Sequence, residues 1–190
     1  DPAGAETSLE TALRLGVDRA EVTLPLAQAY AAQGRYETMF ERISPAGLPK
    51  PMQVEILILR GNAQAELGDL TGAMRSFDDA RAIDALSVPV QLARANLMLR
   101  TGQLARAATL SDEMVKLSPD SWAAWNLKAS VAHLKGDLQA ALADYAKAIS
   151  LNPNNIDARA AQAGVLLDLD RLDQAEKAIA DLQNLSPQEP

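Results

Sequence analysis

Glycine recurs in this 190-residue chain at one fixed interval, and this regularity constrains the fold more than any other feature. The glycines are Gly34, Gly68, Gly102 and Gly136, spaced by 34 residues, and Asp170 lies at the next step. We call this interval of 34 residues the repeat period. Other series keep the same period: Ala27, Gly61, Ala95, Ala129 and Ala163; Ala73, Ala107, Ala141 and Ala175; Tyr36, Leu70, Leu104, Leu138 and Leu172. A strict period of this length indicates that one supersecondary unit is repeated and stacked along the chain.

Each unit has the pattern of a helical hairpin, which residues 122–155 show best. The apolar positions of its first half keep helical spacing: Trp125, Ala129 and Ala132. Gly136 can adopt the positive φ that ends a helix, and Asp137 suits the start of a second helix. Small residues fit where two helices cross closely, because a larger side chain would hold the axes apart. No segment has the alternating pattern of a strand, so the sequence predicts an all-α fold.

Composition supports helices and excludes several classes of protein. Hydrophobic residues make up 48% of the chain but aromatic residues only 4%, so the core has to be built from small aliphatic side chains. The absence of cysteine removes disulfides and thiolate metal sites. No apolar run approaches the roughly 20 residues of a membrane-spanning helix. The net charge of −7 argues against nucleic acid as a partner, because such binding depends on clustered Lys and Arg.

This pattern resembles the tetratricopeptide repeat (TPR), and the resemblance covers essentially the whole chain. It implies a right-handed superhelical solenoid of helix-turn-helix repeats, with eleven helices and the first of them at about residues 4–16. With the glycine as position 15, residues 1–19 are the second helix of a truncated repeat. Five repeats then form a single array: residues 20–53, 54–87, 88–121, 122–155 and 156–189.

The sequence also departs from the family pattern. Asp170 replaces the turn glycine of the last unit, and Ala85 replaces a proline in the second. Residues 44–51 of the first unit contain three prolines. Because proline cannot continue a helix, the second helix of this unit should stop early and be followed by an irregular, exposed connection.

Several short segments carry a narrower resemblance: residues 12–18, residues 31–36 with the proline-rich connection after them, residues 59–62 and residues 127–130. They resemble the TPR lipoproteins of bacterial PEP-CTERM/exosortase systems. Those proteins are long arrays associated with exopolysaccharide production and surface-protein sorting. The resemblance implies that the chain is an internal segment of a periplasmic lipoprotein anchored to the outer membrane. Without it, the expectation is a cytoplasmic protein.

Catalytic chemistry has no support in the sequence. An enzyme would need a nucleophile with a base, a carboxylate pair in a cleft, a metal cluster or a phosphate-binding loop. His133 is the only histidine, and the glycines form neither a dinucleotide-binding fingerprint nor a P-loop. We therefore expect a non-catalytic protein without cofactor or metal. His133 itself is either a solvent-facing polar residue, which the pattern favours, or a groove residue that contacts a ligand.

Binding of another molecule is what the resemblance implies, because one face of the first helices lines an extended concave surface. This face comprises positions 2, 5, 9, 12 and 13 of each repeat, which we call the groove positions. The candidate ligand contacts among them are Gln28, Ile58, Asn62, Leu92, Asn96, Leu99, Arg100, Asn126, Ser130 and His133. The asparagines could hydrogen-bond to the backbone of an extended peptide. Alternatively, asparagine at position 9 is simply frequent in the family.

Three basic residues form a second series at position 7: Arg60, Arg94 and Lys128. One interpretation is a basic ladder that holds an acidic polymer such as a polysaccharide. The interpretation that the pattern favours is structural, with each stem packed on apolar neighbours and each head paired with an acid of an adjacent helix. Trp125 is expected to be packed, whereas Trp122 begins a helix and should be half exposed, where it could stack on a sugar or a partner side chain.

Three functions stay open. A scaffold that binds a protein or peptide leads, followed by a structural spacer and a polysaccharide-binding module. Both ends of the array should expose apolar surface, because residues 1–19 lack a preceding helix and the last helix lacks a polar capping helix. The apolar residues of that last helix are Leu172, Ala175, Ile179 and Leu182. These surfaces predict possible end-to-end self-association.

Overall fold

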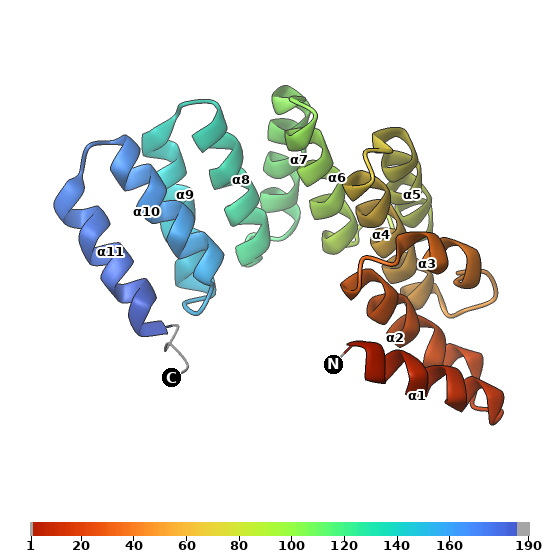
Figure 1. Ribbon diagram of the computed structural model, residues 1–190. Coiled ribbons are helices and arrows are strands. Elements are labelled where there is room, and N and C mark those ends of the chain that lie inside the picture. Colours follow the sequence, from red (N-terminus) through yellow and green to blue (C-terminus); the bar gives the residue numbers. More distant parts are fainter. Residues whose placement is uncertain (1, 186–190) are drawn as a thin grey trace. The chain divides into compact units, whose positions relative to one another are not determined.

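The computed structural model describes residues 2–185, without the side chains of residues 2, 3, 5, 6, 10, 13, 184 and 185. The described residues form eleven α-helices and no strand, which confirms the predicted all-α class (Figure 1). The helices are α1 (Pro2–Arg14), α2 (Arg19–Ala32), α3 (Tyr36–Arg42), α4 (Lys50–Glu66), α5 (Leu70–Ile83), α6 (Val88–Arg100), α7 (Leu104–Leu117), α8 (Trp122–Leu134), α9 (Leu138–Leu151), α10 (Ile156–Asp168) and α11 (Leu172–Leu185). The first helix begins and ends about two residues earlier than expected.

The chain divides into two compact units, residues 1–97 and residues 98–190. In the first unit α1 packs on α2, α4 packs on α5, and α2 contacts both α3 and α4. In the second unit each of the helices from α7 to α11 packs on the next, and α8 also contacts α10. The first helices α2 and α4 therefore lie side by side, as do α8 and α10. The exact repeat boundaries stay a prediction, and residues 186–189 of the last one lie outside the described residues.

The recurring glycines close the first helix of each hairpin. All four have a positive φ between 68° and 83°. Each glycine N–H donates to the carbonyl three residues earlier, and the next N–H donates to the carbonyl five residues earlier, as Asp137 does to Ala132 at 2.9 Å. This pair of bonds satisfies carbonyls that a helix end leaves open. Asp170 makes the same two bonds with a φ of 56°, and it is the only non-glycine residue with positive φ in the described part of the chain.

The small-residue series lies where helices cross. Ala27, Ala95 and Ala129 have no exposed surface. Gly61 of α4 lies against the ring of Phe77 in α5, which is 1% exposed. A methyl group added at Gly61 would overlap that ring, so this crossing requires glycine.

The proline-rich connection follows a short helix, as predicted. α3 has 7 residues, whereas α5, α7, α9 and α11 each have 14. The prediction that the connection is exposed is wrong in one respect, because Ile43 and Leu48 are buried at 4% and 7% exposure. They join a core cluster with residues of α2 and α4, including Tyr30 and Ile56. The early end of α3 leaves the apolar surface of α2 and α4 uncovered, and these two side chains cover it.

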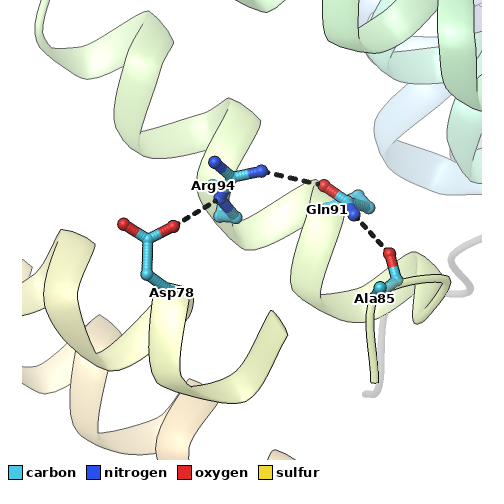
Figure 2. A network of polar contacts seen from close by, with 4 residues as sticks. All are labelled: Asp78, Ala85, Gln91 and Arg94. Carbon is cyan, nitrogen blue, oxygen red and sulfur yellow. Dashed lines mark hydrogen bonds and ion pairs between the residues drawn. The ribbon is translucent and has the colours of Figure 1, made fainter. Parts of the chain in front are cut away.

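A recurring hydrogen bond holds the loop before three of the first helices. In each case a side chain near the helix start donates to a backbone carbonyl six residues earlier. The pairs are Gln91 with Ala85 at 2.8 Å, Trp125 with Pro119 at 2.8 Å and Arg159 with Pro153 at 2.7 Å. Figure 2 shows the first of them. Trp125 is half-buried and serves the fold in this way.

No described helix combines the length and the apolar character that crossing a membrane would require.

Candidate functional site

The first unit holds five of the candidate groove residues. Gln28 lies on α2, Ile58 and Asn62 lie on α4, and Leu92 and Asn96 lie on α6. The three amides are exposed, and the two apolar side chains are half-buried. Within the described part of the chain, neither Asn62 nor Asn96 makes a side-chain hydrogen bond. Their donors and acceptors are therefore available to another molecule.

A cavity of about 300 Å³ in the first unit is lined by one of these residues, Ile58. Its walls come from the start of α4, the end of α5, the loop after it and the start of α6: Lys50, Pro51, Val54, Glu55, Ile58, Ile83, Asp84, Ser87 and Pro89. Ile58 was predicted as a ligand contact, whereas no pattern in the sequence pointed to Ile83, Asp84 or Ser87. These residues belong to a hairpin end, and only the approach of three helix termini brings them together.

The second unit uses two of its candidate side chains, Ser130 and His133, in internal contacts. Its candidates are Leu99, Arg100, Asn126, Ser130 and His133. Ser130 Oγ donates to the Asn126 carbonyl at 3.0 Å and lies 3.0 Å from the Tyr145 hydroxyl. Burial raises the pKa of Tyr145 above its ordinary value of 10.0, and the bond with Ser130 opposes that rise. His133 Nε2 lies 2.7 Å from Asp168 Oδ2. This contact joins α8 to α10, so His133 is not simply a solvent-facing residue.

Two residues of the basic series are ion-paired with the preceding helix. Arg94 Nε lies 3.2 Å from Asp78 Oδ1, and Lys128 Nζ lies 3.0 Å from Asp112 Oδ1. Figure 2 shows Arg94 between Asp78 of α5 and Gln91 of α6, to whose side-chain oxygen it donates at 3.1 Å. The two acids are themselves one repeat period apart, so the pairing follows the repeat.

Arg60 differs because Ser44 occupies the place of the paired acid, and α3 ends before it. Its Nη2 donates to the Phe40 carbonyl at 3.0 Å, and its guanidinium lies 5.6 Å from the centre of the Phe40 ring. All three cations thus contact the second helix of the preceding hairpin. The basic ladder as a binding site for a polymer stays a prediction.

Asp144 is a half-buried acid whose protonation should make the stability of the fold depend on pH. Burial raises the pKa of Asp144 above its ordinary 3.8, with Asp112 and Asp137 adding to the rise and Lys128 opposing it. The folded state therefore binds the proton of the Asp144 carboxyl more tightly than the unfolded state does. The contribution of Asp144 to the free energy of unfolding falls as pH rises from 3.8 through the folded pKa. We expect Asp144→Asn to melt at a higher temperature than the parent at pH 7, with no such advantage at pH 3.

Thermal melts followed by circular dichroism at both pH values measure this difference. Asp79→Asn on the exposed surface of α5, away from the ends of that helix, is the matched control and should change neither melting temperature. An equal gain for Asp144→Asn at both pH values would contradict the electrostatic explanation.

Other predicted contacts lie at surfaces. Trp122 is 40% exposed, in agreement with the half-exposed state expected for it. On α11, Leu172 and Ile179 are 60% and 41% exposed, while Ala175 is buried and Leu182 is half-buried. Self-association through this helix stays a prediction.

Stacked helical hairpins define a helical-repeat protein. One tetratricopeptide repeat sequence profile matches residues 1–38 and 92–156, which is more than half of the chain. A second tetratricopeptide repeat profile matches residues 132–190. The chain belongs to the tetratricopeptide repeat family.

Solved structures share the fold at low sequence identity. The thermophilic TPR protein TTC0263 of Thermus thermophilus is 21% identical, with a TM-score of 0.76 over 90% of this chain and 93% of that one. MamA of Desulfovibrio magneticus is 19% identical, with a TM-score of 0.58 over 97% and 95% of the two chains. A chain of the APC/C hetero-tetramer Cut9-Hcn1 is 12% identical, with a TM-score of 0.74 over 99% of this chain and 38% of that one. Comparison with the curated proteins gave no match.

Proposed function

We propose that this chain is a non-catalytic scaffold that binds an extended segment of a partner protein. The observation that carries the proposal is the pair Asn62 and Asn96, exposed and without hydrogen bonds in the described part of the chain, at equivalent places of successive repeats. Each amide can donate to and accept from a peptide backbone. The half-buried Ile58 and Leu92 precede them by one helical turn and offer apolar contact to the partner's side chains.

The family supports a scaffold, because a solenoid of helical hairpins presents an extended surface to its partners. The Cut9-Hcn1 hetero-tetramer is an example in which a chain of this fold is part of a protein assembly. Free amides and half-buried apolar side chains on α4 and α6 favour a bound segment over a pure spacer. The polysaccharide alternative has less support, because Arg94 and Lys128 already contact carboxylates.

A finer proposal concerns the biological setting. The likeness of residues 12–18, 59–62 and 127–130 to TPR lipoproteins of PEP-CTERM/exosortase systems supports a role in exopolysaccharide production or surface-protein sorting. The chain would then be a segment of a longer lipoprotein, and its partner a protein of that system. Recovery of the full-length protein in the outer-membrane fraction with a lipid-modified N-terminus tests this setting, and recovery in the cytoplasm contradicts it.

The amide pair provides the test of the scaffold itself. We expect Asn62→Ala with Asn96→Ala to weaken partner binding by about 1–3 kcal/mol in sum, because hydrogen bonds to the peptide are lost. Partners are first captured on the immobilised chain and identified by mass spectrometry, and the dissociation constant of each is then measured by calorimetric titration.

The matched control changes the other helix of a hairpin. Arg75 and Asp79 are exposed on α5, and Arg75→Ala with Asp79→Ala should leave both capture and the dissociation constant unchanged. Equal affinities of the parent and the asparagine variant would move the binding surface elsewhere.

A further inference from the structure

The cavity of the first unit combines an apolar wall with an acidic edge. Val54, Ile58, Ile83 and Pro89 are among its apolar lining residues. Its volume of about 300 Å³ lies at the lower end of the range for ligand pockets, which suits one large side chain rather than a whole cofactor. Val54 and Ile83 belong to a core cluster together with Val90 of α6, so packing around the cavity holds its wall in place.

Charge around the cavity favours a cationic neighbour. Two acids, Glu55 and Asp84, line it against a single base, Lys50. The groove positions of the first unit continue this bias, since they include no Lys or Arg and carry the exposed acids Glu21 and Glu55. Two bases of the first helices are turned elsewhere, because Arg60 contacts Phe40 and Arg94 contacts Asp78.

The cavity and the free amides can be reached by one segment. Ile58 lines the cavity, and Asn62 follows one helical turn later, about 6 Å along α4. An extended chain covers that distance in about two residues. A side chain in the cavity and a backbone amide at Asn62 can therefore belong to the same short peptide.

We propose that this cavity receives a large apolar side chain of the partner segment and that a Lys or Arg two residues away, on the same face of the extended segment, pairs with Glu55. The inference rests on the proposed function and specifies its partner as a basic peptide with an apolar anchor. Glu55 is exposed, so the ion pair forms at the rim, while the anchor is removed from water. An acidic peptide would meet Glu55 and Asp84 with like charge.

The probe is the peptide Ala-Arg-Ala-Phe-Ala-Arg-Ala, acetylated and amidated, titrated into the isotope-labelled full chain and followed by amide NMR shifts. We expect shifts at residues that line the cavity, and a dissociation constant about tenfold lower than for two control peptides. One control replaces both Arg by Glu, and the other replaces Phe by Ala. The inference would be overturned if no shifts occurred at the cavity, or if the control peptide with Glu in place of both Arg bound as tightly as the probe.

Charge reversal in the protein completes the experiment. Glu55→Lys should weaken binding of the probe about tenfold without loss of helicity, since Glu55 is exposed. Glu21→Lys is the matched control, because Glu21 is an exposed glutamate one repeat period earlier and does not line the cavity. Equal weakening by both variants would show general charge attraction and overturn a specific site. If the asparagine pair proves necessary for partner binding but the probe fails, the scaffold stands and the cavity proposal falls.

Discussion

Replacing Leu48 by Ala is expected to lower the free energy of unfolding by about 2–5 kcal/mol, an effect typical of a core residue although Leu48 lies in a loop. Its side chain is 7% exposed and packs with Tyr30 of α2 and Ile56 of α4. Removing it opens a cavity where α3 ends early. Urea unfolding measures the loss, and amide hydrogen exchange should show faster opening in α2 and α4.

The control lies in the same connection. Ala46 is exposed, and Ala46→Ser should change the free energy of unfolding by less than about 0.5 kcal/mol. If Leu48→Ala cost no more than this control, the connection would be a free loop and Leu48 would not belong to the core.

Gly61→Ala is expected to destabilise the protein by about 1–3 kcal/mol, because the added methyl group overlaps the buried Phe77 ring. A change from glycine to alanine inside a helix usually stabilises a protein, because alanine is a better helix former than glycine by up to about 1 kcal/mol. The change in the free energy of unfolding expected for Gly61→Ala has the opposite sign. Gly164 in α10 is the matched control, because a methyl group there meets no atom within 4 Å. Gly164→Ala should therefore stabilise the fold, and urea unfolding compares the two variants.

A second substitution separates crowding from other effects. Isoleucine is smaller than phenylalanine and lacks the ring atoms that the added methyl group would meet. Phe77→Ile should accordingly relieve part of the cost of Gly61→Ala in a double-mutant cycle. Strictly additive losses would show that the ring and the methyl group do not compete for space.

Local signals in the sequence predicted most of the fold. The turn after each first helix requires a left-handed backbone conformation that few residues other than glycine adopt. The spacing of the turn glycines, together with Asp170, therefore located five helix ends. The prolines after α3 similarly predicted its early end. The burial of Leu48 was not predictable in this way. A proline- and glycine-rich stretch indicates a loop, and whether one of its side chains enters the core depends on what α2 and α4 leave uncovered.

The candidate site was predictable only in part. Helical spacing placed Asn62 and Asn96 on one face, and both are exposed. Spacing could not show that His133 contacts Asp168, since that contact depends on how α8 and α10 pack. The cavity forms where the start of α4, the end of α5 and the start of α6 pack together, and no sequence pattern predicts that packing. Contacts within one helix were accessible from periodicity, whereas contacts between helices required the structure.

The hydrogen bond that holds three of the loops has a consequence for comparing repeats of this kind. Gln91, Trp125 and Arg159 are an amide, an indole and a guanidinium, yet each donates to the carbonyl six residues earlier. What recurs is the reach of a long side chain with an N–H at its end, while the identity of the residue varies. Repeats aligned by residue type would treat this position as unconstrained. A designer who copied one of these three repeats could keep a donor with this reach and choose the side chain freely within that limit, whereas the two earlier repeats have Thr23 and Leu57 at this position.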